Sequence, residues 1–356
     1  MGVTIKDVAK KTGLSITTVS LVLNKKESRI PEKTRQIIEN VAQELKYTPN
    51  QAAISLSTKK TNLVALIIPR GAFYFFSDLV SSIESACRNT GYALNISLPE
   101  GDESACLDAI REALRRGVDG VIFDPSVFGD NFYAAYIDLV QKSEIPVISL
   151  GGVGAHLLPN SIVPEHRRGG FLAASHLLGL GHTRIGFLAG PKESYVVSDL
   201  LLGIEDAFEE YHLENSALSV IFGSDNAAFG HEGLESALNM RPGTSLTGII
   251  CSSDSIAAGV LRRAYELGIN VAGKLSVIGY GNISLSADYP PPLSTVTIHY
   301  DRIARKAVNL IKKLNQGSPL CTPELVQPSL IARSSTQAAA LEKDQVSTQA
   351  ASLSLP

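Results

Sequence analysis

The chain has 356 residues, more than one folding core usually contains, so its length predicts two or three domains. Its 44% hydrophobic and 19% charged residues are typical of globular proteins and exclude a disordered or fibrous chain. Residues 1–60 contain eleven Lys and Arg but five Asp and Glu, a charge of +6 that leaves −9 for the remainder. A basic segment on an acidic body indicates that this segment meets a polyanion.

The sequence carries no sign of a membrane segment or a metal site. No apolar run approaches the roughly 18 residues that span a bilayer, and charges occupy the N-terminus where a signal peptide is apolar. The four cysteines are far apart and form no C-x-x-C pair, which predicts reduced thiols rather than zinc ligands or disulfides. We therefore expect a cytoplasmic protein without metal, cofactor or membrane partner.

Two short helices are expected on either side of Gly13. Thr4 and Asp7 have the spacing of a capping box, which predicts a helix from near Ile5 that stops before Gly13. Ser15 can cap a second helix, and its inward-facing apolar residues are Val19, Val22 and Leu23. Its outward-facing residues are Ile16, Thr17, Ser20 and Leu21. This arrangement is typical of a helix-turn-helix, whose second helix presents side chains to the major groove.

A third helix is expected from Pro31 to about Lys46. Its predicted buried stripe consists of Ile37, Ile38, Val41, Ala42 and Leu45. On periodicity alone, a small three-helix bundle with hydroxyl groups on a wet face remains an alternative to DNA binding. The segment after it, residues 48–61, can begin a helix at Thr48 and Pro49, but an isolated helix of about two turns is marginal in water. We expect that helix only where something holds it.

From residue 62 onward, apolar strand-like runs alternate with helix-like segments, a rhythm typical of parallel sheets covered on both faces. Two such series predict two α/β lobes with the periplasmic-binding-protein-like (type I) architecture. We expect one lobe from residues 62–160 and 293–322, and the other from 161–292 and 323–333. Open sheets bind ligands beyond the carboxyl ends of their strands, so the cleft between the lobes is the expected ligand site. Residues 334–356 are small, polar and aperiodic, which predicts a disordered tail.

No pattern of an enzyme is complete. The sequence GGVGAH begins like a glycine-rich phosphate loop, but Leu157 stands at its third glycine position. Neither a G-x-S-x-G elbow nor an H-E-x-x-H pair occurs, and the histidines lack metal-ligand spacing. We therefore expect no catalytic residues.

Several segments together resemble the lactose-repressor (LacI/GalR) family of transcription regulators. They are VTIKDVAKKTGLSITTVSLVLN and RIPEKTRQIIENVAQELKYTPNQAAISL in the head, then TNLVALIIP, RRGVDGVIF, LLGLGHTRIGFLAGP, LSVIGYGNI and PPLSTV in the body. The resemblance runs from residue 3 to about 333 in family-like order. It implies an all-α helix-turn-helix headpiece over residues 1–47, a hinge helix and linker over 48–61, and an effector-binding and dimerisation body over 62–333.

The resemblance also implies which residues contact DNA. Ile16, Thr17 and Leu21 match positions that read bases. Residues matching groups near phosphates or bases are Thr4, Ser15, Thr18, Ser20, Asn24, Thr34 and Tyr47. Asn50, Ala53 and Leu56 match the hinge helix, with Leu56 at the position of a leucine wedged into the minor groove. Leu21 and Ile54 stand where many members carry arginine, which favours apolar contact with thymine methyl groups over guanine recognition.

The expected effector site departs from the family pattern. Leu200 stands at a usual arginine position, Gly281 and Asn282 at an aspartate and a second polar position, and Asp225 at a frequent aromatic one. Asp254 follows a strand, where it can orient a hydroxylated ligand or cap the next helix. Of the aromatic run that ends the first strand, Phe73, Tyr74 and Phe75 are expected near the cleft. Without the arginine and the carboxylate, two alternatives are predicted: an atypical small-molecule effector, with carbohydrate-related compounds as one candidate class, or no effector.

Together, these expectations predict a homodimeric repressor that binds double-stranded operator DNA with an inverted repeat. When bound to DNA, it is associated with the nucleoid. An effector in the cleft is expected to modulate its affinity for the operator. The alternative is a cytoplasmic two-lobed solute-binding module whose DNA recognition is weak or independent of effector. Retention on duplex DNA at low salt, lost steeply as salt rises, discriminates between the two.

Overall fold

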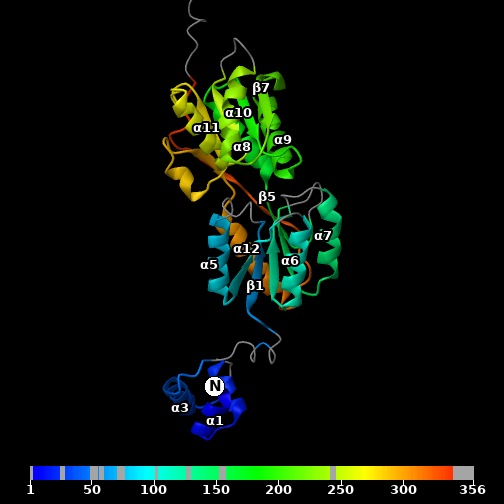
Figure 1. Ribbon diagram of the computed structural model, residues 1–356, viewed down its shortest axis with the longest axis vertical. Coiled ribbons are helices and arrows are strands. Elements are labelled where there is room, and N and C mark those ends of the chain that lie inside the picture. The colour runs from blue at the N-terminus through cyan, green and yellow to red at the C-terminus, as the bar shows by residue number, and fades with distance from the viewer. Residues whose placement is uncertain are drawn as a thin grey trace, which may run out of the picture. The chain divides into compact units, whose positions relative to one another are not determined.

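A computed structural model of the chain describes residues 3–24, 29–48, 55, 60–69, 77–100, 103–125, 130–151, 158–240 and 246–339. The chain divides into two compact units, Met1–Asn62 and Leu63–Pro356. Figure 1 labels the helices and strands of both units. The predicted hinge residues Asn50, Ala53 and Leu56 lie outside the described residues.

The first unit contains three helices, α1 (Ile5–Thr12), α2 (Ile16–Leu23) and α3 (Glu32–Glu44). The capping box at the start of α1 is present, since the Asp7 carboxylate accepts hydrogen bonds from the backbone N–H and the hydroxyl of Thr4, each 2.8 Å long. Gly13 ends α1 with φ of 70°, a left-handed conformation that favours glycine. The Ser15 hydroxyl caps α2 by accepting from the backbone N–H of Thr18 at 3.1 Å. The predicted start and end of α1 and the predicted capping of α2 by Ser15 are therefore confirmed.

The core of this unit is small. Its buried residues are Val8, Ala9, Val19, Val22, Ile38 and Ala42. All three helices contribute to it, which fixes α2 on the other two. Ile37 was predicted in the buried stripe of α3, but 44% of its surface is exposed, so that prediction is wrong. The apolar stripe of α3 is only one residue wide at this turn, because Ile38 fills the space between the helices.

The second unit contains two six-stranded sheets, one in each lobe. The first sheet has the order β11-β5-β4-β3-β1-β2 and all its strands are parallel. Its elements are β1 (Leu63–Ile67), α5 (Ser77–Thr90), β2 (Ala93–Ser97), α6 (Glu103–Arg115), β3 (Gly120–Phe123), α7 (Asp130–Lys142), β4 (Val147–Leu150), β5 (Ser161–Pro164), α12 (Tyr300–Leu314) and β11 (Glu324–Val326). The alternation of helix and strand predicted from the sequence is confirmed here.

Both faces of this sheet are covered, which explains why its central strands read as continuous apolar runs. Along β1, Val64 and Leu66 join the core on the side of α5 and α12, whereas Ala65 and Ile67 join the core formed by α6 and α7. Figure 1 shows α5 and α12 beside each other. This two-sided packing leaves the carboxyl ends of the strands as the free edge of the lobe.

The second sheet has the order β12-β10-β9-β8-β6-β7, and only β12 runs antiparallel. Its elements are α8 (His166–Gly179), β6 (Ile185–Ala189), α9 (Tyr195–Glu210), η3 (Asn215–Ala217), β7 (Leu218–Phe222), α10 (Ala227–Asn239), β8 (Gly248–Cys251), α11 (Asp254–Glu266), β9 (Ser276–Gly281), η4 (Ser284–Ala287), β10 (Ser294–Thr297) and β12 (Ser329–Ile331). Helices α8 and α9 cover one face, and α10 and α11 cover the other.

The chain crosses between the lobes at three places, and all three predicted boundaries are wrong. Residues 161–164 were assigned to the second lobe, but they form β5, which pairs with β4 in the first sheet. Strand β10 was assigned to the first lobe, together with residues 293–322, but pairs with β9 in the second sheet. Strand β11 lies within residues 323–333, which were assigned to the second lobe, but pairs with β5 in the first sheet, whereas β12 pairs with β10 in the second. A short apolar run predicts a strand but not its partner, because pairing depends on contacts far away in the sequence.

Helices α8 and α9 touch through their backbones. A Cβ atom placed on Gly170 would lie 2.0 Å from the carbonyl oxygen of Leu200, and one placed on Gly203 would lie 1.8 Å from that of Arg167. No real Cβ approaches a carbonyl oxygen so closely, so this crossing requires glycine at both positions.

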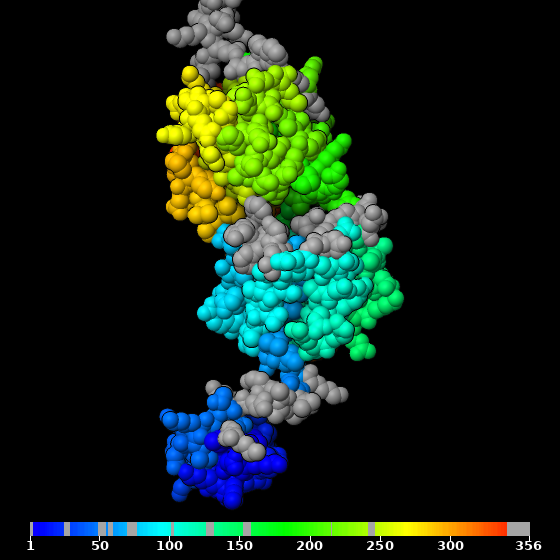
Figure 2. Space-filling model, viewed as in Figure 1, coloured from blue at the N-terminus to red at the C-terminus, as the bar shows by residue number. Residues whose placement is uncertain are grey.

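Helices α10 and α11 cross in the same way on the opposite face of the second sheet. A Cβ on Gly230 would lie 2.0 Å from the Ile256 carbonyl oxygen, and one on Gly259 would lie 1.9 Å from that of Ala227. Figure 2 shows these helices as the yellow-green and yellow surface of the second lobe. The sheet is therefore held between two helix pairs that are each in backbone contact.

Residues 334–339 pack against the amino-terminal ends of the central strands β9 and β10 of the second sheet. The Ser335 hydroxyl is fully buried and donates to the Val277 carbonyl at 2.6 Å, and the His182 ring bonds the Gln337 carbonyl at 3.0 Å. The prediction of a disordered tail beginning at residue 334 is therefore wrong for these six residues. Small polar side chains predicted disorder there, but the Ser335 hydroxyl instead bonds backbone groups at the amino-terminal ends of β9 and β10.

Candidate functional site

The exposed surface of α2 is the candidate DNA-contacting site of the first unit. Ile16 is 46% exposed and Thr17 is exposed, while Ser20 and Leu21 are half-buried. Ile16 is exposed to solvent because the buried residues of α2, Val19 and Val22, lie on the side of the helix that packs on the core. The structure thus brings the predicted base-reading residues Ile16, Thr17 and Leu21 to the same short helix.

Several predicted DNA-contacting groups hydrogen-bond to one another. The hydroxyls of Ser15 and Thr18 lie 2.8 Å apart, and the Asn24 amide donates to the Ser20 hydroxyl at 3.0 Å. The Thr4 hydroxyl is engaged by Asp7, as described above. A hydroxyl group in such a bond can still accept a further hydrogen bond, so these contacts orient the side chains and leave them able to bind DNA.

The remaining predicted contacts of this unit are Thr34 on α3 and Tyr47 after it. Both side chains are half-buried. Tyr47 packs against the helical core, and its backbone N–H donates to the Ala42 carbonyl at 2.8 Å. Tyr47 is thus fixed to the unit rather than to the linker that follows it.

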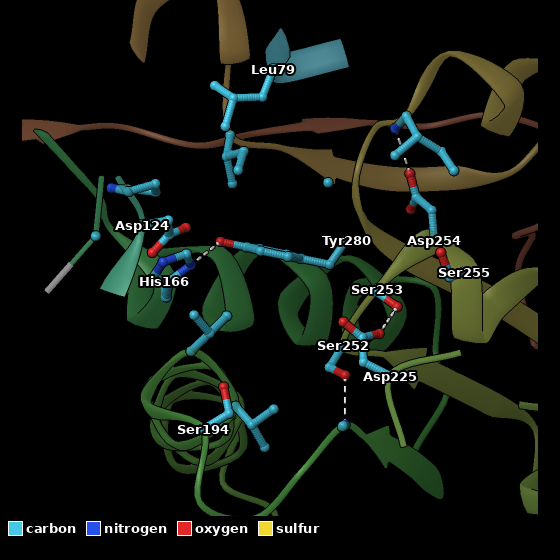
Figure 3. Close-up of a pocket in the computed structure, with 18 of the residues that line it drawn as sticks. Leu79, Asp124, His166, Ser194, Asp225, Ser252, Ser253, Asp254, Ser255 and Tyr280 are labelled. Atoms are coloured by element: carbon cyan, nitrogen blue, oxygen red, sulfur yellow. Dashed lines mark hydrogen bonds between the residues drawn. The ribbon is translucent and has the colours of Figure 1, made fainter. Parts of the chain in front are cut away.

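A cavity of about 210 Å³ lies where the two lobes face each other. The first lobe contributes Leu79 from α5, Asp124 after β3, and Leu150 and Gly151 at the end of β4. The second lobe contributes residues that follow its own strands, including Gly190, Ser252 and Gly281. Much of the lining therefore comes from the carboxyl ends of the parallel strands of both sheets, the position predicted from the sequence. Figure 3 shows its labelled side chains.

Asp254 lies in the wall of this cavity and is almost completely buried. Its carboxylate accepts from the Thr295 hydroxyl at 2.6 Å and from the Ile283 backbone N–H at 2.8 Å. Burial raises its pKa to about 6. Ser253, rather than Asp254, caps α11 through the N–H of Ile256. Of the two roles considered for Asp254, helix capping is therefore wrong, and the carboxylate instead fixes the segment after β9.

Asp225 is the predicted effector residue that the cavity exposes most openly. It is accessible to solvent, lines the cavity and accepts a short hydrogen bond from the Ser253 hydroxyl. The surrounding cleft walls desolvate it, which raises its pKa. A carboxylate in this setting gains most from a ligand that donates hydrogen bonds.

Two other predicted effector residues do not reach the cavity. Leu200 is only 2% exposed and lies in the core of the second lobe, because α9 turns that side toward α8. The Asn282 side chain accepts from the Arg333 guanidinium at 2.8 Å and does not line the cavity, whereas Gly281 lines it. These placements correct the expectation for Leu200 and Asn282. Phe73, Tyr74 and Phe75 lie outside the described residues.

His166 and Tyr280 are cavity residues that the sequence did not indicate. Their Nδ1 and hydroxyl oxygen lie 2.7 Å apart, as Figure 3 shows, and both residues line the cavity. Burial lowers the pKa of His166 to about 4, so the ring is neutral at physiological pH. His166 begins α8 directly after β5, and since that strand was missed, nothing placed this histidine at a strand end.

The lowered pKa of His166 predicts a specific dependence of stability on pH. The unfolded chain takes up a proton near pH 6.5 and the folded chain only near 4, so the stabilisation is present above pH 6.5 and is lost as pH falls. Between pH 7.5 and 5, we expect the wild type to lose about 2 kcal/mol more unfolding free energy than His166→Gln. Urea unfolding of both proteins measures this. The raised pKa of Asp254 acts in the opposite direction, but equally in both. Parallel curves for the two proteins would contradict the prediction.

Within the described part of the chain, no group of acidic, histidine or cysteine side chains is arranged to hold a metal ion. No described helix combines the length and apolar character needed to cross a membrane.

Comparisons with known proteins agree with both units. Residues 4–50 match the family model for bacterial regulatory proteins of the lacI family, and residues 174–336 match a periplasmic binding protein-like domain. The transcriptional regulator DegA of Bacillus subtilis is 31% identical over 338 residues, covering 94% of this chain and 98% of that protein. The transcriptional repressor PurR of Aliivibrio fischeri is 28% identical, covering 93% and 98%.

Among solved structures, a lac repressor dimer bound to operator and the anti-inducer ONPF superposes with a TM-score of 0.81. It is 29% identical, and the match covers 95% of this chain and all of that one. The relatives named here are transcriptional regulators and not enzymes. The helix-turn-helix unit, the two-lobed body and the similarity along almost the full chain all lead to the same conclusion. The chain belongs to the lacI family of bacterial regulatory proteins.

Proposed function

We propose that this protein is a transcriptional repressor that binds an inverted-repeat operator as a homodimer and responds to a small molecule held between its lobes. The observation that carries the proposal is the joining of an α2 surface that exposes Ile16 and Thr17 to a two-lobed body with a lined cavity. The similarity to regulators along almost the full chain supports it.

In the proposed complex, α2 of one protomer enters the major groove, and α2 of the second protomer enters the next major groove. Ile16 offers an apolar surface for thymine methyl groups, and Thr17 offers a hydroxyl for base edges. The positive charge of residues 1–60 attracts the DNA phosphates, and this attraction does not depend on the DNA sequence. Asn50, Ala53 and Leu56 are proposed to fold as a hinge in the minor groove between the half-sites.

The proposed effector is a small molecule with hydrogen-bond donors, because the cavity lining includes the carboxylates of the exposed Asp225 and the half-buried Asp124. A ligand bound there contacts both lobes and so stabilises one arrangement of them relative to another. A change in that arrangement alters the spacing of the two linkers in a dimer, and thereby operator affinity.

Selection of bound duplexes from a random library by the purified protein tests the proposal. An enriched inverted repeat, retained at low salt and released steeply as salt rises, supports it. Retention of duplexes without any enriched sequence supports instead a two-lobed solute-binding module whose DNA recognition is weak.

Ile16 and Ile37 form a matched pair for testing the base-reading surface. Both are isoleucines with similar exposure, 46% and 44%, but only Ile16 lies on the proposed contact face of α2. Ile16→Ala is expected to weaken binding to the selected operator about tenfold, while binding to random duplex changes little. Ile37→Ala is expected to leave both affinities unchanged. Fluorescence anisotropy with the two duplexes measures the difference, and equal losses for the two variants would rule out this reading of α2.

A further inference from the structure

A hydrogen-bonded contact joins the two lobes next to the cavity. Asp78 lies in the first turn of α5, in the first lobe. Its carboxylate accepts from the Ser284 backbone N–H at 2.7 Å and from the Ser284 hydroxyl at 2.6 Å. Ser284 begins η4, directly after β9 of the second lobe. One carboxylate thus receives two charge-assisted hydrogen bonds from a single residue of the other lobe, which fixes direction as well as distance.

The peptide beside Ser284 is held by a second carboxylate. The Ile283 backbone N–H donates to Asp254, the buried acid in the cavity wall. Two consecutive backbone N–H groups therefore point to carboxylates from two different lobes. Gly281 and Ile283 both line the cavity, so this short segment is at once a wall of the ligand site and the link to the first lobe.

The other side of the contact is equally close to the ligand site. Leu79, the neighbour of Asp78 in α5, is buried and lines the cavity. Helix α5 packs along α12, whose first residue, Tyr300, also lines it. A movement of either lobe that strains the bonds between Asp78 and Ser284 therefore moves lining residues on both sides.

We propose that Asp78 and Ser284 form an interlobe clasp, a pair of positioning residues that holds the lobes in the arrangement that binds ligand. The clasp is made at the surface, where Ser284 is exposed and Asp78 half-buried, so water can replace it without unfolding either lobe. That makes it a reversible contact that can differ between two lobe arrangements separated by a small free energy. Its effect on operator affinity rests on the proposed function, but its effect on the lobes does not.

Hydrogen exchange of the full-length protein tests whether the clasp exists in solution. In Asp78→Asn, the side chain keeps its shape but loses the charge, and one acceptor oxygen becomes a donor. We expect the Ser284 amide to exchange about tenfold faster in this variant than in the wild type. In Ser284→Ala the amide keeps its acceptor and is expected to exchange at nearly the wild-type rate. Asp108→Asn, in an exposed pair with Arg111 on α6, is the matched control. Equal exchange of Ser284 in wild type and Asp78→Asn overturns the clasp.

Distances between the lobes test whether the clasp positions them. Nitroxide labels are attached at Gln141→Cys on α7 and Glu232→Cys on α10, both exposed sites, and report the distance between the lobes. The background carries Cys321→Ser, because the other three cysteines are buried and Cys321 is not. Asp78→Asn and Ser284→Ala are expected to broaden this distance distribution or move its maximum, whereas Asp108→Asn leaves it unchanged. A distribution identical to that of the parent for both clasp variants overturns the positioning role.

Operator binding then separates the two proposals. A wild-type protein that enriches no operator overturns the proposed function, whatever the exchange and distance measurements give. If the distance distribution moves and operator affinity changes at least threefold in the clasp variants, coupling between the clasp and DNA is supported. If the distribution moves while operator affinity stays within twofold of the wild type, that coupling is overturned and the clasp positions the lobes alone.

Discussion

Val19→Asp is expected to abolish operator binding while the two-lobed body remains folded. Val19 is fully buried in a core of six residues, and a helical unit this small has little stability to lose. An unpaired carboxylate in that core costs several kcal/mol, enough to unfold the unit. Because the body has its own cores and forms a separate compact unit, its thermal unfolding is expected at the wild-type temperature. Operator affinity should fall at least about a hundredfold.

Ile37→Asp is the matched control for this experiment. It adds the same charge to the same unit and removes an apolar side chain, but at a position that is 44% exposed. Its expected effect on folding is small, since an exposed carboxylate stays hydrated. Circular dichroism of residues 1–62, produced alone and in the full chain, and anisotropy with operator measure both outcomes. Val19→Asp protein that binds operator as well as Ile37→Asp would disprove the role of this core.

Gly203→Ala is expected to destabilise the second lobe by about 3 kcal/mol or more. The new methyl group would lie 1.8 Å from the Arg167 carbonyl oxygen, and this neighbour is backbone rather than a flexible side-chain end. Helices α8 and α9 must therefore move apart, which opens the packing of Leu200 and Ile204. Denaturant unfolding followed by circular dichroism measures the change in unfolding free energy.

Gly233→Ala on α10 separates this steric effect from helix propensity. Its methyl group would meet the Leu188 side chain at 3.4 Å, an ordinary contact. Alanine is favoured over glycine inside a helix by about 1 kcal/mol, so this variant is expected to be as stable as the wild type or more so. If Gly203→Ala and Gly233→Ala shift the unfolding midpoint equally, the backbone contact between α8 and α9 is not what demands glycine.

Local patterns in the sequence predicted most of the fold. The spacing of Thr4 and Asp7 and the apolar residues of α2 gave the first two helices, because capping and periodicity act within a few residues. Ile37 was misplaced because two adjacent isoleucines satisfy the same helical period, and only packing against the other helices decides which one is buried. The short strands β5 and β11 at the crossovers have three or four residues each, too few for a distinct pattern.

The candidate site was less predictable, since it depends on which side of an element faces the other lobe. Asp225 and Gly281 were found because they stand at effector positions of the family that the sequence resembles, and both line the cavity. Leu200 was misassigned because the glycine contact that turns α9 toward α8 leaves no trace in hydrophobic periodicity. Asp78 carried no signal, because an acidic residue in the first turn of a helix is already explained by the helix dipole.

The three crossovers have a consequence for how the protein is made on the ribosome. The first lobe begins to form when β1 to β5 emerge, yet α12, which covers one face of its sheet, ends at Leu314. At about 5–20 residues per second, roughly 8–30 s separate the synthesis of β5 from that of α12. During that interval the apolar side of Val64, Leu66 and Ile148 lacks part of its cover. The apolar core of the N-terminal lobe can therefore be completed only after almost all of the C-terminal lobe has been synthesised.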